Sequence, residues 1–258
     1  MPVAVITGSS SGIGLATAHR FVAQGYSVVL HGKSNLSGLQ QAAKQLLPLL
    51  GSGCDIFCIT ADVGCSLACK SLVQACFNWK NGVDVWVNNA GADVLTGESS
   101  KWGFDEKLEL LLAVDLKGTI RLSRLVADRM LAMPQSKQLR SIINISWDQA
   151  QLGMEDEPGQ LFCTIKAAIA AFSTSLALSV SPSIRVNTVA PGWIRTAWGD
   201  DEASSYWDRR ATNESQLQRW GRADDVAATI CWLASSEAEF ICGQTINVNG
   251  GRRYYPSP

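Results

Sequence analysis

The stretch that decides the fold is Thr7-Gly8-Ser9-Ser10-Ser11-Gly12-Ile13-Gly14. It follows an apolar run over Val3–Thr7 that is typical of a buried strand, and it opens a helical pattern over Gly12–Gln24. Glycines let the backbone turn tightly and approach a ligand, and a helix N-terminus presents free N–H groups and a positive dipole end. The stretch therefore predicts a cradle for a pyrophosphate. The residues expected to form it are Gly8, Ser10, Ser11, Gly12, Ile13 and Gly14.

Short β-branched runs and longer helical patterns alternate along the rest of the chain. The expected strands are Val3–Thr7, Ser27–His31, Asp55–Ala61, Val83–Asn88, Ser141–Ser146, Ile184–Ala190 and Thr245–Val248. The expected helices are Gly12–Gln24, Leu36–Leu47, Ser66–Trp79, Asp105–Met133, Gln160–Ser179 and Ala223–Ser235. Because the strands are apolar on both sides, helices are expected to cover both faces of the sheet. This pattern predicts an α/β fold, a Rossmann-type doubly wound domain with a parallel sheet of about seven strands flanked by helices.

The length of 258 residues suits one domain, so residues 1–258 are expected to fold as a single dinucleotide-binding unit. Residues 192–222 form the one long stretch without a regular pattern. That stretch is too long for a plain connection and predicts a lid over a substrate site.

Composition excludes several classes of protein. A net charge of −1 gives no reason to expect nucleic acid or an anionic membrane as a partner, and no apolar run in the sequence has the length of a membrane span. The chain has eight cysteines but only two histidines. Free buried thiols are therefore expected rather than a metal site, and a Ser-His-Asp hydrolase is disfavoured. With no signal-peptide pattern at the N-terminus, we expect a cytoplasmic protein.

Further motifs follow the glycine stretch in a fixed order: Asp62-Val63, Asn88-Asn89-Ala90-Gly91, Pro191-Gly192-Trp193-Ile194-Arg195-Thr196 and Gly243–Gly251. Together with Thr-Gly-x-x-x-Gly-x-Gly they resemble the short-chain dehydrogenases/reductases over essentially the whole chain. The resemblance implies a nicotinamide dinucleotide cofactor whose adenine contacts Asp62-Val63. It also implies that the other cofactor contacts are made by Asn89, Ala90, Gly91, Lys166 (to the nicotinamide ribose), Pro191, Gly192, Ile194 and Thr196.

The end of the second strand indicates which dinucleotide is bound. An acidic residue there would bind the ribose hydroxyls of NAD, but the chain reads His31-Gly32-Lys33-Ser34. Gly32 removes the carboxylate that would repel a 2′-phosphate, and Lys33 supplies a cation to meet one. Gly32, Lys33 and Ser34 therefore predict NADP as the cofactor, with Ser10 and Ser11 as added hydroxyl donors.

The catalytic group of the resembled family is Asn, Ser, Tyr and Lys, and only the lysine is retained, as Lys166. The tyrosine position holds Phe162, which has no O–H to donate. The serine position falls on Trp147 and the asparagine position on Asp115. These three departures from the family's catalytic group indicate either an altered reaction or a protein without catalytic activity.

Other groups in the sequence are candidates for the source of the proton. Asp148 adjoins the old serine position, and partial burial would raise its pKa and suit it to act as an acid. Asp115 is expected to pair with Lys166 directly or through water, and a water held by Lys166 is a further donor. The acidic loop Glu155–Glu157 is expected to be simply solvated.

Tryptophans gather in the segments expected to line the substrate space. Trp147, Phe162, Trp193 and Trp198 predict an aromatic-walled pocket for a small, flat or apolar molecule. The favoured function is an NADP(H)-dependent oxidoreductase of the carbonyl reductase or alcohol dehydrogenase type with an atypical proton donor. Two alternatives stay open: an NADP-binding pseudoenzyme, and a non-redox isomerase, lyase or cyclase that uses the same pocket. The resemblance also implies a homodimer or homotetramer.

Overall fold

Seven parallel strands form the central sheet of the computed structural model, which describes residues 1–134, 139–195 and 205–253. The strands are ordered β3-β2-β1-β4-β5-β6-β9 across the sheet. Their bounds are β1 Val3–Ile6, β2 Ser27–Gly32, β3 Ile56–Thr60, β4 Val85–Asn88, β5 Arg140–Ile145, β6 Ile184–Pro191 and β9 Thr245–Val248. All seven expected strands are confirmed, and so is the doubly wound Rossmann-like fold.

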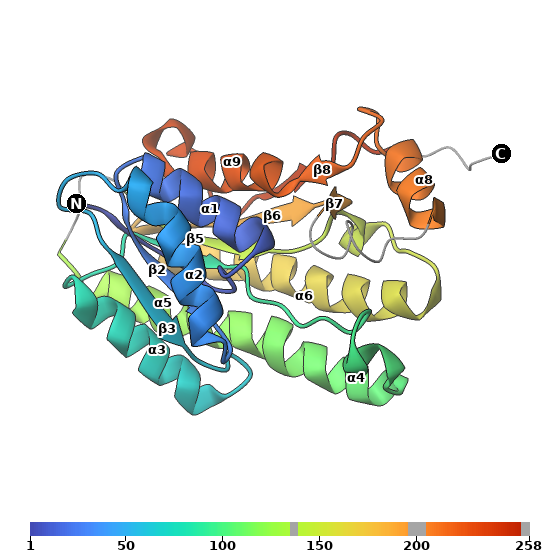
Figure 1. Cartoon of the computed structure of the whole chain (residues 1–258), viewed down its shortest axis with the longest axis horizontal. Coiled ribbons are helices and arrows are strands. Elements are labelled where there is room, and N and C mark those ends of the chain that lie inside the picture. The colour runs from blue at the N-terminus through green and yellow to red at the C-terminus, as the bar shows by residue number, and fades with distance from the viewer. Residues whose placement is uncertain (135–138, 196–204, 254–258) are drawn as a thin grey trace.

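Helices cover both faces of the sheet (Figure 1). One layer holds α1 (Gly12–Ala23), α2 (Leu36–Leu46) and α9 (Ala223–Ala234). The other holds α3 (Ser66–Trp79), α4 (Phe104–Leu111), α5 (Thr119–Leu131) and α6 (Asp156–Val180). The short 3-10 turns are Leu47–Leu49, Glu98–Lys101, Asp148–Gln151 and Ser236–Ala238.

The apolar strands are buried on both sides because successive side chains point to opposite faces. Ala4 and Ile6 pack into the core beneath α1 and α9, whereas Val3 and Val5 pack into the core beneath α3 and α5. This arrangement leaves the carboxyl ends of the strands as the edge where loops can build a site.

One expected helix is interrupted. The continuous pattern over Asp105–Met133 predicts a single helix, but the structure has α4, a π-helical turn over Leu112–Gly118, and then α5. Single π-turns inside helices occur mostly at functional sites, where the extra residue redirects a side chain. Here the π-turn carries Asp115, which is buried.

The stretch 192–222 contains regular structure that the sequence did not predict. A two-stranded parallel pair joins β7 (Ile194–Arg195) to β8 (Gly221–Arg222), and α8 spans Ser205–Glu214. The expectation of an irregular stretch is therefore wrong for these residues. The helix was missed because the face it turns inward combines Trp207 and Ala211 with two charged residues, Arg210 and Glu214. The predicted contacts Thr196 and Trp198 lie outside the described residues.

Candidate active site and cofactor cleft

The glycine loop between β1 and α1 has no room for larger side chains. Gly8 has a φ of +64°, and a Cβ placed on it would lie 2.8 Å from the Cα of Ala90. A Cβ on Gly14 would lie 2.2 Å from the carbonyl oxygen of Gly8. Glycine is needed at both positions because of these approaches, as the cradle prediction requires.

The end of β4 holds this loop in place. Asn89 Nδ2 donates to the carbonyl oxygens of Thr7 and Gly8, both at 2.9 Å. Thr7 Oγ1 accepts the N–H groups of Asn89 and Ala90, also at 2.9 Å. The motif Asn88-Asn89-Ala90-Gly91 therefore fixes the shape of the loop as well as lining the space beside it.

A cleft of about 500 Å³ lies beside the loop. Its lining includes ten of the predicted cofactor residues: Gly8, Ser10, Ser11, Gly32, Lys33, Asp62, Val63, Asn89, Ala90 and Gly91. His31, Ala61, Ala92, Asp93, Leu110 and Val114 complete it. Gly12, Ile13 and Gly14 form the N-terminus of α1, whose free N–H groups suit a pyrophosphate, and the volume of the cleft is that of a ligand pocket. The residues present thus fit a dinucleotide.

The remaining predicted cofactor residues lie outside this lining. Ser34 follows β2 and is exposed. Pro191 ends β6, and Ile194 begins β7. Gly192 lies between them, where a Cβ would come within 2.6 Å of Asn249 Cβ and 3.3 Å of Asp148 Oδ2.

A surface ion pair marks the rim of the cleft. Lys33 Nζ lies 3.2 Å from Asp62 Oδ2, and the two side chains are 66% and 42% exposed. Exposed pairs of this kind contribute little to stability, so the lysine is free to exchange this partner for an anionic ligand group.

Lys166 and Asp115 form a direct ion pair within the site. Lys166 Nζ lies 2.8 Å from Asp115 Oδ2, and the side chains are only 15% and 1% exposed. The other carboxylate oxygen of Asp115 accepts the N–H of Ala92 at 2.8 Å. Of the two expected forms of this pairing, the structure has the direct one.

A cluster of aromatic rings lies beyond the end of β5. Trp147 meets Phe162 edge to face, with ring centroids 6.3 Å apart, and meets Trp193 in the same way at 6.4 Å. The neighbouring hydroxyl of Ser146 donates to the carbonyl oxygen of Lys166 at 2.7 Å, so its proton is engaged in the main chain. The three rings form a continuous aromatic wall, and their role in contacting a substrate stays a prediction.

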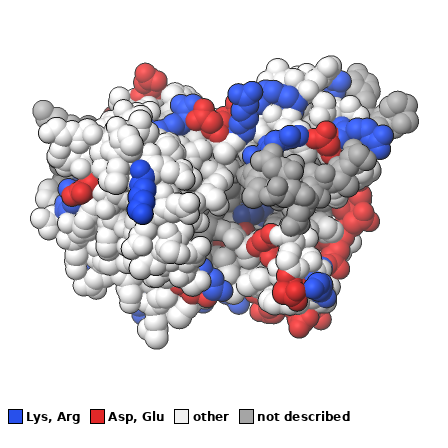
Figure 2. All heavy atoms as spheres, viewed as in Figure 1, with Lys and Arg blue, Asp and Glu red and all other residues white. Residues whose placement is uncertain are grey.

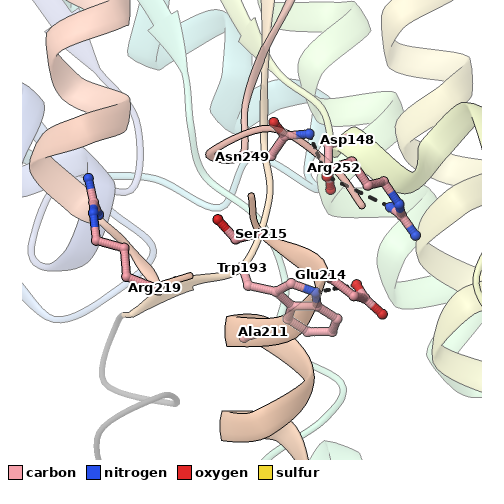
Figure 3. A pocket seen from close by; sticks show the side chains of 8 residues that line it. All are labelled: Asp148, Trp193, Ala211, Glu214, Ser215, Arg219, Asn249 and Arg252. Atoms are coloured by element: carbon pink, nitrogen blue, oxygen red, sulfur yellow. Dashed lines mark hydrogen bonds and ion pairs between the residues drawn. The ribbon is translucent and has the colours of Figure 1, made fainter. Parts of the chain in front are cut away.

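Asp148 faces a different set of groups. Its Oδ2 accepts from Asn249 Nδ2 at 3.0 Å and lies 3.8 Å from Arg252 Nη1 (Figure 3). Among the described residues no hydrogen bond reaches its buried Oδ1, and no contact joins its carboxylate to Lys166 or Asp115. Burial raises the pKa of Asp148, against the lowering effects of Asn249 and Arg252. The adjoining cavity of about 10 Å³ has the size of one water.

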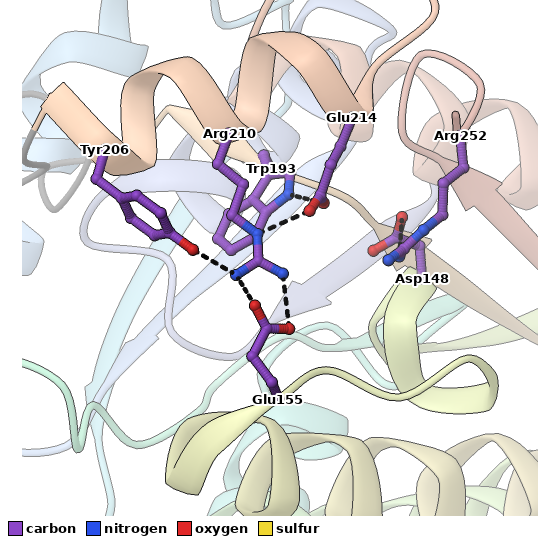
Figure 4. A network of polar contacts seen from close by, with 7 residues as sticks. All are labelled: Asp148, Glu155, Trp193, Tyr206, Arg210, Glu214 and Arg252. Atoms are coloured by element: carbon purple, nitrogen blue, oxygen red, sulfur yellow. Dashed lines mark hydrogen bonds and ion pairs between the residues drawn. The ribbon is translucent and has the colours of Figure 1, made fainter. Parts of the chain in front are cut away.

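A network around Arg210 joins α8 to the loop before α6 (Figure 4). Arg210 donates to both carboxylate oxygens of Glu155, at 2.6 and 3.0 Å, and to Glu214 Oε1 at 2.7 Å. Glu214 Oε2 accepts from Trp193 Nε1 at 2.7 Å, which fixes one ring of the aromatic wall. The hydrogen bond from Arg210 lowers the pKa of Glu155.

The acidic loop is largely exposed, as expected, at 58% for the Glu155 side chain and 42% for that of Glu157, but both carboxylates are also paired, Glu157 with Lys107 at 2.7 Å. In the sequence, Arg210 and Glu214 stand four residues apart, which is the spacing of an ion pair on one helix. This spacing was the signal from which the network around Arg210 could have been predicted.

Comparisons with known proteins find similarity over almost the whole chain. The protein-family model described as enoyl-(acyl carrier protein) reductase matches residues 8–253. The 3beta-hydroxysteroid dehydrogenase 1 of Eggerthella lenta is 31% identical over 254 residues, which cover 98% of this chain and 94% of that protein.

Two solved structures share the fold over nearly the whole chain. A short-chain dehydrogenase from Burkholderia cenocepacia in complex with NADP has a TM-score of 0.83 and 26% identity, covering 97% of each chain. A 3-oxoacyl-[acyl-carrier protein] reductase from Brucella melitensis in complex with NAD has a TM-score of 0.85 and 28% identity, covering 96% of each. The family match, the identity and the common fold lead to one conclusion: this chain belongs to the short-chain dehydrogenase/reductase family of oxidoreductases.

Proposed function

We propose that this protein is an NADP(H)-dependent oxidoreductase of the carbonyl reductase or alcohol dehydrogenase type, with a proton donor other than tyrosine. The observation that carries the proposal is the cofactor cleft, which keeps the glycine loop and Asn89, together with the retained Lys166 in its ion pair with Asp115. Holding the reactants in place supplies much of the rate of such a reaction.

The preference for NADP rests on the rim of the cleft. Replacing Lys33 by aspartate is expected to reverse the preference, because it removes the cation and adds a carboxylate that repels a 2′-phosphate. A change of at least tenfold in the ratio of the two dissociation constants, about 1.4 kcal/mol, is expected by titration with NADPH and NADH. Lys44→Asp, on α2, is the matched control. Equal affinities in the unaltered protein, or tighter NADH, would overturn the preference.

The proton is proposed to come from Lys166. When bound, the nicotinamide ring supplies a hydride to the carbonyl carbon or accepts one from the alcohol. The Lys166 ammonium, held by Asp115, is proposed to hydrogen-bond a water that gives its proton to the developing alkoxide and is reprotonated through Lys166. Asp148 takes second place, because its contacts lie with Asn249 and Arg252.

The substrate is proposed to be a small carbonyl compound or alcohol with an aromatic or apolar body. Trp147, Phe162 and Trp193 offer ring edges and faces for such a group. On the face shown in Figure 2, basic and acidic side chains are intermixed and gather toward α4 and α8. A mixed surface of this kind suits a small-molecule enzyme better than a nucleic-acid-binding protein.

The deciding experiment is a panel of carbonyl compounds assayed by the absorbance of NADPH. Consumption of NADPH with at least one compound is expected. The rings at the two hydroxyl positions favour a second candidate, an NADP-binding pseudoenzyme. That candidate wins if NADPH binds tightly and no compound is reduced. Turnover of a compound without any change in nicotinamide absorbance would instead indicate a non-redox enzyme.

We further propose a homodimer or homotetramer with two-fold symmetry. By length and composition α6 is apolar enough to cross a membrane, yet it packs on the sheet and contributes Leu161, Ile165 and Ile169 to the core. Only 28% of its most apolar stretch is buried, and Leu178 is 82% exposed. A second subunit is the expected cover for this face. Light scattering at micromolar concentration should give a multiple of the 27.8 kDa chain mass; a monomer would contradict it.

We also propose that the enzyme is located in the cytoplasm. All eight cysteines are free thiols, as is usual for proteins of a reducing compartment.

A further inference from the structure

His31 lies at the end of β2 and lines the cofactor cleft while its side chain is almost fully buried. Its ring contacts two separate segments. Nδ1 lies 3.3 Å from the N–H of Gly8 in the glycine loop, and Nε2 lies 3.0 Å from the carbonyl oxygen of Ala61 after β3. The main chain adds two more bonds to the loop: Ser9 N–H donates to the His31 carbonyl, and His31 N–H donates to Ser9 Oγ, both at 2.9 Å.

These contacts determine one tautomer of the ring. The N–H of Gly8 is only a donor, so Nδ1 must present its lone pair. The ring proton is therefore on Nε2, where the Ala61 carbonyl accepts it. An imidazolium would have donors at both nitrogens and would leave the Gly8 N–H without an acceptor. Burial also lowers the pKa of His31 to about 4, against the raising effects of Ala61 and Asp62, so the ring is neutral at neutral pH.

The two segments that His31 joins both line the cleft, and the proposed function assigns them to different parts of the dinucleotide. Gly8 belongs to the loop that faces the pyrophosphate position. Ala61 precedes Asp62, whose carboxylate pairs with Lys33 at the rim. A change in the ring would therefore move the phosphate loop and the adenine end relative to each other.

We propose that His31 is a positioning residue for the dinucleotide: its neutral Nε2–H tautomer links Gly8 to Ala61 and sets the spacing between the phosphate and adenine ends of the cleft. This inference rests on the proposed cofactor function and deepens it. Asn89 holds the loop from the β4 side, and His31 holds it from the β2 side.

Two amide substitutions separate the two ring contacts. The amide of His31→Asn matches Nδ1 and can still accept from Gly8, but it is too short to reach Ala61. The amide of His31→Gln reaches the Nε2 position and can still donate to Ala61, but it leaves the Gly8 N–H unpaired. NADPH tests the whole cleft, and adenosine 2′-monophosphate tests the adenine end alone.

For His31→Gln we expect the dissociation constant of NADPH to rise roughly tenfold, the scale of one hydrogen bond, while that of adenosine 2′-monophosphate stays unchanged. For His31→Asn both constants should rise. His19→Gln, which alters the one other histidine, is the control and should change neither. If both variants bind both ligands like the unaltered protein, with only the melting temperature lowered, His31 is structural and the inference fails.

Nitrogen-15 NMR of the histidine rings gives an independent readout. In the His19→Gln protein the single remaining imidazole should show a proton on Nε2 and none on Nδ1, both with and without NADP. A proton on Nδ1, or a mixture of tautomers, would overturn the inference. If the unaltered protein bound NADH instead of NADPH, only the cofactor preference would fail, and the same variants would be tested with NADH and adenosine monophosphate.

Discussion

Lys166→Met is expected to lower the free energy of unfolding by about 3–5 kcal/mol, because it leaves a buried carboxylate without its cation. Asp115 is 1% exposed, and its second oxygen is already bonded to the Ala92 N–H. Turnover is expected to fall by about 10² to 10⁴ as well, since the proposed route for the proton runs through this ammonium. Urea denaturation and NADPH assays measure the two effects.

The double variant Lys166→Met/Asp115→Leu separates stability from chemistry. Replacing a buried ion pair by apolar groups is often neutral for stability, so the double variant should regain most of the lost free energy of unfolding. Its turnover should stay low. If Lys166→Met lowers the free energy of unfolding by less than about 1 kcal/mol, the ion pair between Lys166 and Asp115 contributes no more than a surface ion pair does.

Phe162→Tyr is expected to raise turnover by about 10² to 10⁴, because it restores an O–H at the position of the family's general acid. Position 162 lies one helical turn before Lys166 on α6, so the two side chains share a face of the helix. The measurement is kcat with the best compound of the carbonyl panel. Phe162→Leu is the matched control, since it keeps the position apolar and should produce no gain.

The starting level of activity decides what a gain means. A rise from measurable turnover supports an enzyme that already moves its proton by another route. Activity that exists only in Phe162→Tyr supports the pseudoenzyme. With cofactor binding intact, an unchanged kcat would refute the expectation that a hydroxyl at position 162 reaches the reacting oxygen.

The sheet and the cofactor cleft could be predicted because their signals are local. Runs such as Val3–Ile6 are apolar on both faces, and the glycine loop needs glycine for reasons of backbone space at Gly8 and Gly14. The direct contact between Asp115 and Lys166 was one of two expected forms, and nothing in the sequence distinguishes a direct pair from one bridged by water.

The parts that escaped prediction depend on partners distant in the sequence. The π-turn at Asp115 interrupts a helical pattern that is continuous in the sequence. The inward face of α8 includes Arg210, whose burial makes sense only with Glu155 from another segment. Which way Asp148 points depends on Asn249 and Arg252 near the other end of the chain.

The order of strands in the sheet has a consequence for synthesis on the ribosome. The first four strands to be made, β1 to β4, occupy one contiguous half of the sheet, and β5, β6 and β9 add to it in order. The nucleotide-binding half is therefore complete in the nascent chain before β5 exists. At about 5–20 residues per second, β4 presents an open edge with Trp86 for several seconds. In that interval the open edge of β4 is most able to pair with a wrong strand. Chaperone binding to the nascent chain is therefore expected to matter most at this stage.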